Sequence, residues 1–287
     1  YEVVKCVREE LGQRALEQEI LERYDGIVLW DINTGLRNKL LKFCYSRSIR
    51  VYMMPKIPDI MIQGASQLHL FDTPILFTRE YSMTVEQRFV KRAIDIICSL
   101  ILIIITSPIM IITAVIIKCY DHGPVLYKQV RCTRNMKEFK IVKFRSMRTD
   151  AEKDGVARLA SKNDDRITPI GKFIRKVRID ELPQLFNILK GEMSFIGPSP
   201  ERPEIIRQYQ EDMPEFTFRT KVKAGLAGYA QVYGKYNTTP YDKLKLDLFY
   251  IENYSVWLDI KLIFRTLLVL LTPDKSTEAF EDNKKTE

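Results

Sequence analysis

The feature that most constrains this chain is the segment at residues 96–117, which contains no charged side chain. It is about 22 residues long and, at 1.5 Å per residue, a helix of that length spans roughly 33 Å, enough to cross the hydrocarbon core of a bilayer. A single transmembrane helix is the simplest interpretation of the composition.

Two observations favour a helix that enters the membrane and returns. Ser107 and Pro108 stand in the middle of the segment, and a proline inside a helix removes a backbone donor and bends the chain. Both flanks are also basic, with Arg88, Lys91 and Arg92 before the segment and a run of lysines and arginines from Lys118 onward after it. Because basic flanks favour the cytoplasm, both ends are expected on that side. On the residues alone, the re-entrant and the spanning helix both stay open.

Hydroxyl groups stand beside the proposed break. Thr106, Ser107 and Thr113 are placed to bond the carbonyls that Pro108 frees. Asp95 stands just before the apolar segment, where a carboxylate needs a partner or a headgroup-level position. We expect pairing with Arg92 or Arg88, or a charge at the helix end.

Residues 1–84 alternate predicted helices and strands. A polar periodic stretch up to Ile20 predicts a helix, residues 26–31 and 49–54 predict strands, 36–45 predict a second helix, and 74–77 predict a third strand. This alternation indicates a partial Rossmann-like module. No G-x-G-x-x-G is present, so a structural or regulatory module is favoured over a nucleotide site. Because Tyr1 falls inside a predicted helix, we expect the natural protein to extend further upstream.

Residues 120–272 predict a second, largely helical domain. Strands are expected near 124–127 and 139–145, and helices at 150–160, 172–177, 182–189 and 203–210. The apolar stretch 260–271 predicts either a core helix or one lying in the membrane interface. A polar tail follows at 273–287. The fold class is therefore mixed α/β and membrane-associated, with a re-entrant helix at 85–119 between the two domains.

The net charge and the cysteine pattern limit the classes of binding partner and of site that this chain is expected to have. The formal net charge of +8 indicates an anionic partner such as a lipid, a phosphorylated substrate or nucleic acid. The five cysteines form no C-x-x-C pair, and the two histidines lack metal-ligand spacing, so neither disulfide nor zinc chemistry is indicated. Nucleic acid is the weakest of the three, since no recognition motif accompanies the charge.

The adjacent carboxylates Asp180 and Glu181 are the strongest chemical candidates. The spacing to Pro183 predicts a helix start with Asp180 as its N-cap, and capping alone is one explanation for the pair. The functional alternative is that the two carboxylates divide two tasks between them, binding Mg²⁺ and attacking phosphorus. Asp164 and Asp165 are interpreted as a loop turn.

Basic residues cluster on either side of this pair. A solvated face is the ordinary interpretation, but arginine and lysine also match phosphate oxygens, so a pyrophosphate cradle is the alternative. The cluster comprises Lys143, Arg145, Arg148, Arg166, Lys172, Arg175, Lys176, Arg178 and Arg202.

Several ordered motifs together resemble the bacterial sugar transferases, the polyprenyl-phosphate hexose-1-phosphate transferases that begin capsule, exopolysaccharide and O-antigen assembly. The resemblance runs from about residue 89 to 271, and residues 1–84 resemble the accessory domain of the larger members, which usually carry transmembrane helices further upstream. The motifs are KRAID (91–95), SP (107–108), GPV (123–125), KFRSM (143–147), RITPIG (166–171), DELPQ (180–184) and MSFIGP (193–198).

The resemblance implies a mechanism and a topology. Asp180 would attack the β-phosphorus of a UDP-sugar, UMP would leave, and undecaprenyl phosphate would take the phosphosugar from Asp180. Mg²⁺ would sit with Asp180 and Glu181. The remaining substrate- or phosphate-binding residues would be Lys143, Arg145, Arg175, Gln184 and Arg202. The helix would break at Ser107 and Pro108, and the catalytic domain would lie on the cytoplasmic face of the bacterial inner membrane, in a homodimer.

The sequence departs from the family pattern at three positions. Thr133 and Met136 replace usual glycines of a turn, and Ser199 replaces a usual arginine, whose charge Arg202 would supply. These departures keep open a second hypothesis, a membrane-anchored scaffold without catalytic activity.

Overall fold

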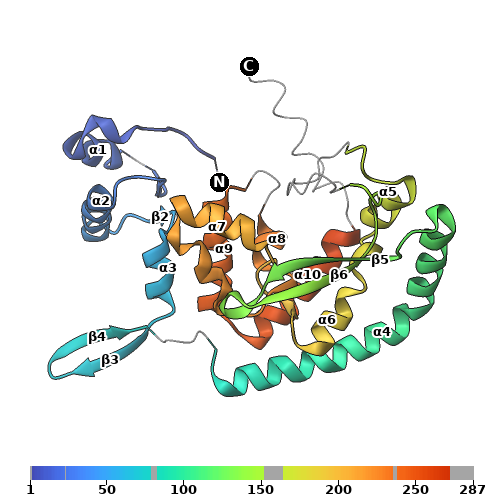
Figure 1. The fold of residues 1–287 in the computed structure, drawn as a ribbon. Coiled ribbons are helices and arrows are strands. Elements are labelled where there is room, and N and C mark those ends of the chain that lie inside the picture. Colours follow the sequence, from blue (N-terminus) through green and yellow to red (C-terminus); the bar gives the residue numbers. More distant parts are fainter. Residues whose placement is uncertain (1, 23, 79–82, 152–163, 235–237, 272–287) are drawn as a thin grey trace. The chain divides into compact units, whose positions relative to one another are not determined.

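The computed structural model describes residues 2–22, 24–78, 83–151, 164–234 and 238–271 (Figure 1). Its contacts divide the chain into two units, Tyr1–Asp59 and Ile60–Glu287. The sequence placed a boundary after residue 84, where the long helix α4 begins. The predicted helix at 150–160 falls mostly outside the described residues, as does the tail at 273–287.

The first unit is a small α/β module. It contains a 3₁₀ turn η1 (Glu9–Leu11), helices α1 (Gln13–Ile20) and α2 (Thr34–Ser46), and strands β1 (Ile27–Leu29) and β2 (Val51–Met53). The two strands are parallel, with Ile27 opposite Val51. Leu16, Leu29 and Leu40 form the core between helices and strands.

The predicted strands at 26–31 and 49–54 and the helix at 36–45 are thus confirmed. The first helix is shorter than expected, because Gly12, with φ of 81°, separates η1 from α1. The guanidinium of Arg37 pairs with Asp59, which joins α2 to the end of the unit.

The third predicted strand lies elsewhere. Residues 73–77 form strand β4 (Thr73–Phe77), which pairs antiparallel with β3 (Ser66–Leu70) in a hairpin of the second unit. The expectation that it joins the parallel sheet is wrong. Phe71 takes a left-handed φ of 54° in the two-residue turn, and such turns favour pairing with the preceding strand. The Rossmann-like interpretation therefore rests on β1 and β2 and stays a prediction.

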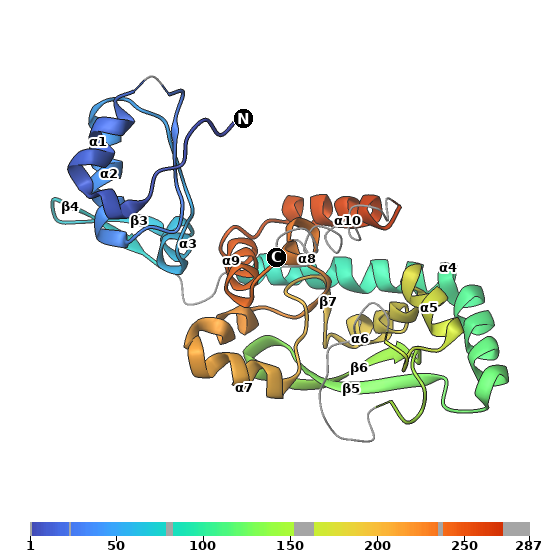
Figure 2. The ribbon, with the colours of Figure 1, turned by 90° about the horizontal axis from the view of Figure 1, so that it is seen from above.

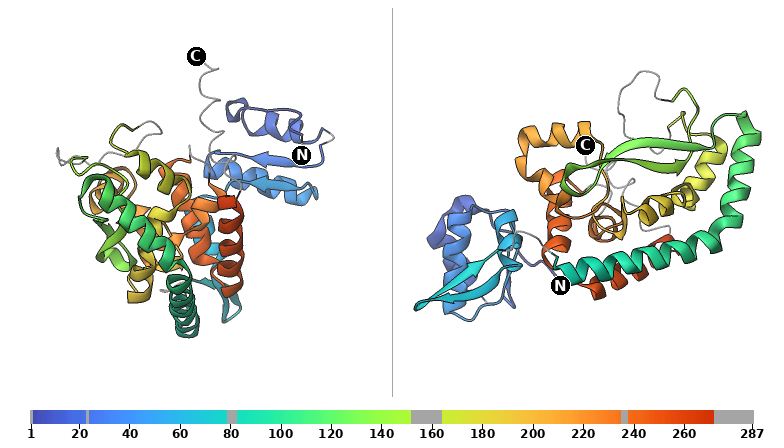
Figure 3. Two further views of the ribbon diagram at one scale, coloured as in Figure 1. Left: turned by 90° about the vertical axis from the view of Figure 1, so that its right-hand side faces the viewer. Right: turned by 60° about the horizontal axis from the view of Figure 1, so that its bottom comes forward.

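The second unit begins with α3 (Ile57–Gln63), which spans the division, and its longest element is α4 (Val85–Asp121). Thr84 and Gln87 form a capping box at the start of α4. Among the described residues, this is the one helix long and apolar enough to cross a membrane. Most of its isoleucines and leucines between Ile97 and Ile116 are exposed. Figures 1 and 3 show that α4 changes direction along its length.

Ser107 and Pro108, the expected site of the break, lie inside one continuous helix. Pro108 lacks the N–H that would bond the carbonyl of Ile104. The hydroxyl of Ser107 donates to that same carbonyl at 2.8 Å, and the hydroxyl of Thr106 donates to Leu102 at 2.7 Å. The expectation that hydroxyls satisfy the freed backbone is confirmed for Ser107. The helix therefore does not need to unwind where the proline interrupts its hydrogen bonding.

The rest of the second unit packs helices around two short sheets (Figure 2). Strands β5 (Leu126–Cys132) and β6 (Glu138–Phe144) form an antiparallel hairpin around the 3₁₀ turn η2 (Arg134–Met136), and β7 (Ser194–Ile196) pairs parallel with β8 (Gly225–Ala227). The helices are α5 (Pro169–Lys176), α6 (Gln184–Lys190), α7 (Pro203–Asp212), α8 (Tyr229–Tyr233), α9 (Pro240–Glu252) and α10 (Val256–Leu271), with 3₁₀ segments η3 (Ile179–Glu181) and η4 (Pro214–Lys221).

Helix α10 confirms the predicted core role for residues 260–271 on one face, while a position in the membrane interface stays a prediction. Leu262 is fully buried against the core, whereas Phe264, Leu267 and Leu268 are exposed. Helices α6 and α10 and strand β7 contact α4. The expected strand at 139–145 and the helices at 172–177, 182–189 and 203–210 are confirmed as β6, α5, α6 and α7.

Candidate functional site

The first turns of α4 are anchored in the second unit by buried polar contacts. The ammonium of Lys91 lies 2.5 Å from Oδ2 of Asp259 on α10, and the hydroxyl of Tyr250 donates to Oδ1 of the same carboxylate at 2.8 Å. All three side chains are buried. Lys91 is therefore a structural cation that is paired inside the second unit.

The KRAID motif makes two further contacts. The guanidinium of Arg92 donates to the carbonyls of Ile188 and Leu189, each at 2.7 Å, at the negative end of α6. Asp95 is buried and accepts hydrogen bonds from the hydroxyl of Ser194 at 2.9 Å and the backbone N–H of Phe195 at 3.1 Å. Its expected pairing with Arg92 or Arg88 is wrong, because β7 provides two donors to Asp95 and α6 engages Arg92.

The last turns of α4 pack against a different part of the same unit. Ile117 forms a buried cluster with Phe144 of β6 and Ile174 of α5, and Ile179 packs against that cluster. The guanidinium of Arg145 pairs with Asp121 at the end of α4 and donates through Nε to the carbonyl of Pro124 at 2.6 Å. Both ends of α4 are therefore fixed to one folded body.

The carboxylate pair lies beside this second anchor. Asp180 and Glu181 belong to the short 3₁₀ segment η3, which contacts α5 and β6. Arg178, just before it, takes a left-handed φ of 58°. Helix α6 begins only at Gln184, with Pro183 as its N-cap. The prediction that Asp180 caps a helix is wrong, because Asp180 lies inside the 3₁₀ turn and Pro183 is the residue that precedes α6. Capping therefore no longer explains the pair.

Asp180 is held in an environment unfavourable to a carboxylate. Asp180 is buried, with a relative exposure of 7%. Burial, and secondarily the charge of Glu181, raises the pKa of Asp180 to about 6, against the opposing effect of Lys143, Arg175 and Arg178. A buried carboxylate with a raised pKa next to phosphate-compatible cations is the kind of group that functional sites contain.

Glu181 differs from its neighbour in having partners. Its Oε1 accepts a hydrogen bond from Lys143 of β6 at 3.2 Å and from Arg178 at 3.4 Å. The two adjacent carboxylates therefore have separate environments, one neutralised by cations and one buried.

Two opposite charges in this site remain unsatisfied. Within the described part of the chain, Oδ1 of Asp180 and Nη1 of Arg175 are each buried without a hydrogen-bond partner. Arg175 acts on Asp180 through its charge, since it lowers the carboxyl pKa, but the two groups form no hydrogen bond. Buried polar atoms are normally satisfied, so this pair indicates a place prepared for a ligand.

The other predicted binding residues divide into two groups. Gln184 is buried at the start of α6, three residues beyond the end of η3 and directly after Pro183. Arg145 already uses its guanidinium on Asp121 and Pro124. Arg202 precedes α7 as its N-cap residue. The structure therefore brings Lys143 and Arg175 to the carboxylate pair, while phosphate-binding roles for Arg145 and Arg202 stay predictions.

The aspartates at 164 and 165 behave as a turn. Oδ1 of Asp164 accepts from the backbone N–H of Arg166 at 3.0 Å, and the guanidinium of Arg166 pairs with the same carboxylate. These hydrogen bonds lower the pKa of Asp164 to about 2. Asp164 is thus committed to its own loop.

The positions that depart from the family pattern have local solutions. Met136 takes a left-handed φ of 59° in the β5–β6 turn, a conformation that glycine favours. Thr133 uses its hydroxyl to bond the carbonyl of Glu192 at 2.8 Å and accepts from the N–H of Ala224 at 3.1 Å. The carbonyl of Ser199 accepts from the guanidinium of Arg219 at 3.0 Å.

Sequence reasoning missed the partners that hold these residues in place. Asp259 and Tyr250 lie more than 150 residues from Lys91, and the one sign of them in the sequence is a single acidic residue in an apolar helix. Nothing in the sequence around Asp121 indicates that it pairs with Arg145.

A donor set for a magnesium ion exists only in part. Among the described residues, no cluster of three or more His, Cys, Asp or Glu side chains is arranged to hold a metal ion. Asp180 and Glu181 together offer two carboxylates, and Mg²⁺ is commonly held by one or two carboxylates with the rest of its ligands from water and substrate phosphate. The unpartnered Oδ1 of Asp180 fits such an ion.

Comparison with known proteins shows which family this chain resembles. A family model described as bacterial sugar transferase matches residues 86–273. The chain is 38% identical over 259 residues to a UDP-N-acetylgalactosamine-undecaprenyl-phosphate N-acetylgalactosaminephosphotransferase of Aeromonas hydrophila, covering 87% of this chain and 60% of that protein. It is 33% identical over 285 residues to an undecaprenyl-phosphate galactose phosphotransferase of Salmonella typhimurium, covering 87% and 58%.

A third relative has another sugar in its name. The chain is 36% identical over 211 residues to a UDP-glucose:undecaprenyl-phosphate glucose-1-phosphate transferase of Escherichia coli K12, covering 72% of this chain and 44% of that protein. The chain therefore spans 60% or less of the length of these three relatives. For the first two, the similarity extends beyond the region that the family model matches.

Proposed function

Because this chain belongs to the bacterial sugar transferase family, we propose that it transfers a hexose-1-phosphate from a UDP-sugar to undecaprenyl phosphate, and that Asp180 is its nucleophile. The relatives named above act on undecaprenyl phosphate with N-acetylgalactosamine, galactose or glucose. The names of these relatives support transfer of a sugar phosphate to undecaprenyl phosphate, but each names a different sugar. We propose that this reaction starts the assembly of exopolysaccharide, capsule or O-antigen.

In the first step, a carboxylate oxygen of Asp180 attacks the β-phosphorus of the UDP-sugar. A bond forms between that oxygen and phosphorus, the bond from phosphorus to the bridging oxygen breaks, and UMP leaves with the electron pair. The raised pKa supports this role, since a carboxylate with a pKa of about 6 is more basic than an ordinary aspartate yet mostly ionised at neutral pH.

Cations around Asp180 supply the complementary charge. Nη1 of Arg175 is buried without a partner and is available to a phosphate oxygen. Lys143, through its contact with Glu181, places a second cation beside the pair. Holding the diphosphate against the carboxylate offsets the repulsion between two anions, which otherwise opposes the attack.

In the second step, an oxygen of undecaprenyl phosphate attacks the phosphosugar on Asp180. The new bond joins the two phosphates, and the bond to Asp180 breaks, which restores the carboxylate. The location of η3 supports access for a lipid, because Ile179, next to Asp180, packs against the cluster that contains Ile117 of α4.

A re-entrant topology for α4 belongs to the proposal. Residues at both ends of the apolar segment, Lys91 with Asp95 at one end and Ile117 with Asp121 at the other, contact one folded unit. A helix that crossed the bilayer would place these ends on opposite sides, out of reach of one domain. We therefore place both ends and the second unit on the cytoplasmic face of the inner membrane.

Magnesium completes the proposed site. Asp180 and Glu181 would hold the ion, and when bound it would neutralise charge on the substrate diphosphate. Lys143 and Arg178, which already pair with Glu181, hold that carboxylate in position.

The single observation that carries the proposal is the buried, unpartnered Oδ1 of Asp180 beside the unpartnered Nη1 of Arg175. The test is UMP release by the purified chain with Mg²⁺, undecaprenyl phosphate and a panel of UDP-sugars. We expect release with at least one sugar and none from Asp180→Asn, with the exposed Asp212→Asn as the matched control. Full activity of Asp180→Asn would exclude the nucleophile. Lipid binding without UMP release from any sugar would favour the scaffold.

A further inference from the structure

A second cationic site lies at the start of α4. A pocket of about 210 Å³ opens between the first turns of α4, the turn η2 and the segment that leads into β8. Its lining contains a single carboxylate, Asp95, together with the apolar Met83 and Val222 and six cationic side chains, which are Arg88, Lys91, Arg92, Arg134, Lys221 and Lys223. None of the residues of the proposed active site lines it.

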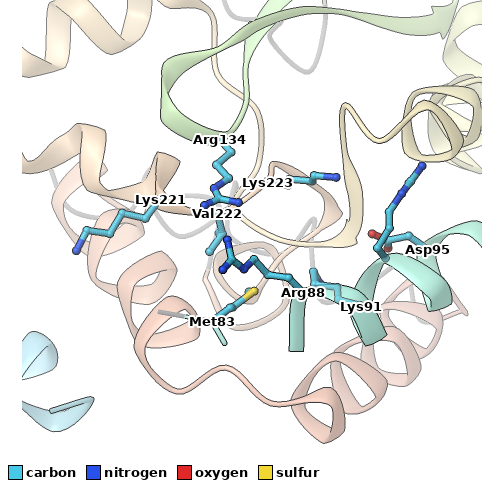
Figure 4. A pocket seen from close by; sticks show the side chains of 9 residues that line it. Met83, Arg88, Lys91, Asp95, Arg134, Lys221, Val222 and Lys223 are labelled. Atoms are coloured by element: carbon cyan, nitrogen blue, oxygen red, sulfur yellow. The ribbon is translucent and has the colours of Figure 1, made fainter. Parts of the chain in front are cut away.

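The cations approach the pocket from separate elements (Figure 4). Arg134 descends from η2 and Arg88 rises from α4, so that their guanidinium groups converge near Val222, while Lys223 extends toward Asp95. Lys221 points away, over the ring of Phe218. Like charges from distant parts of the chain repel one another, and an anion between them offsets that repulsion.

The carboxylate in the lining is already engaged. Asp95 accepts hydrogen bonds from Ser194 and Phe195. Lys91 and Arg92 have their own partners in Asp259 and the carbonyls of α6. Within the described residues, Lys223 forms neither a side-chain hydrogen bond nor a salt bridge. Burial, and after it the charge of Arg92, lowers the pKa of the Lys223 ammonium, so its charge is poorly compensated.

The position of the pocket indicates the source of the anion. Arg88 and Lys91 precede the uncharged segment that starts at residue 96, so the pocket stands where headgroups meet the apolar part of the helix. We propose that this pocket binds the phosphate of an anionic membrane phospholipid and fixes the start of α4 at the headgroup layer.

The acceptor lipid of the proposed reaction does not suit this pocket. Its phosphate must reach Asp180, which lies beside the opposite end of α4 from Asp95. The pocket therefore holds a resident lipid that anchors the helix, and the inference is independent of the proposed reaction.

The test is equilibrium binding of a short-chain fluorescent phosphatidylglycerol to the full chain in a neutral detergent. Losing one charge-assisted contact costs about tenfold in affinity, so we expect about tenfold weaker binding for Lys223→Gln. Lys128→Gln, which removes an exposed lysine of β5, should leave affinity unchanged, and Lys223→Arg should restore it. Unchanged circular dichroism and thermal unfolding of Lys223→Gln separate lost binding from lost folding.

Further arms identify the ligand. Phosphatidylcholine, which is zwitterionic, should displace the fluorescent phosphatidylglycerol only weakly. Inorganic phosphate, added at a concentration equal to the dissociation constant of phosphatidylglycerol, should not displace it. Asp180→Asn should bind phosphatidylglycerol as the wild type does, whatever its effect on UMP release. Equal binding by Lys223→Gln, equal competition by inorganic phosphate, or stronger displacement by undecaprenyl phosphate than by phosphatidylglycerol would each overturn the assignment.

Discussion

Lys143 donates a hydrogen bond to Glu181, with 3.2 Å between Nζ and Oε1, and so places a cation beside the buried carboxylate of Asp180. The contact joins strand β6 to η3 and separates the duties of the two carboxylates. Glu181 is the neutralised partner, and Asp180 carries the raised pKa. The following predictions depend on this division.

Replacing Lys143 removes the cation from Glu181. Since Lys143 lowers the pKa of Asp180, Lys143→Gln should raise that pKa and slow UMP release by about tenfold, the typical cost of one charged contact. The matched control is Lys140→Gln, which removes an exposed lysine of the same strand. Unchanged rates of UMP release in both variants would show that Lys143 has no role in the site.

The pH dependence follows from the same carboxylate. Asp180 must be ionised to attack, and its pKa is about 6, so single-turnover UMP release should rise with pH through about 6 and level off above 7. The midpoint should move upward in Lys143→Gln. A flat profile between pH 5 and 8 in both proteins would contradict the role of Asp180.

Asp180 should also destabilise the fold at neutral pH. Its folded pKa lies above the ordinary 3.8, so the folded state binds the proton more tightly, and stability falls as pH rises from about 4 through 6. A shift of this size corresponds to about 3 kcal/mol. Thermal unfolding at pH 7.5 should therefore give a higher Tm for Asp180→Asn than for wild type, while Asp212→Asn gives no change. A lower Tm for Asp180→Asn would indicate a structural carboxylate.

The buried pair between Lys91 and Asp259 should matter for the anchoring of α4. Lys91→Met leaves the carboxylate of Asp259 buried without its cation, and breaking such a pair costs about 3–5 kcal/mol. The double variant Lys91→Met with Asp259→Leu removes both charges and should recover much of the loss. Denaturation in detergent measures both, and equal destabilisation by the single and double variants would show that the charge itself is unimportant.

The topology of α4 is open to direct labelling. Single cysteines at Val85 and Lys118, both exposed, stand beyond the two ends of the apolar segment in a cysteine-free background. In intact cells, a membrane-impermeant maleimide should label neither until the cells are opened. Labelling of one position from outside would mean that α4 spans the membrane.

Local sequence signals foretold much of this arrangement. The apolar segment and the alternation in β6 are encoded within a few residues of where they act. The sequence predicts the Asp180–Glu181 pair as the chemical centre, but it does not predict the local geometry of the pair. Asp, Pro and spacing are compatible both with an N-cap and with a 3₁₀ turn, and only the left-handed Arg178 before it distinguishes them.

Long-range pairing explains the remaining differences. Residues 74–77 have the composition of a strand, but their partner is set by the turn at Phe71 rather than by the parallel pair β1 and β2. Asp95 received donors from Ser194 and Phe195, about 100 residues away, which no local pattern indicates. Arg145, predicted for phosphate, pairs with Asp121 for the same reason.

The most direct test of the account is the covalent intermediate on Asp180. The purified chain is incubated with Mg²⁺ and the UDP-sugar that supports UMP release, without a lipid acceptor, and the protein is acid-quenched for intact-mass and peptide analysis. We predict a mass increase of one phosphosugar on the peptide that contains Asp180, with one UMP released per chain, and loss of the adduct when undecaprenyl phosphate is added. UMP release to completion with no adduct on wild type, or an adduct that persists in Asp180→Asn, would contradict the account.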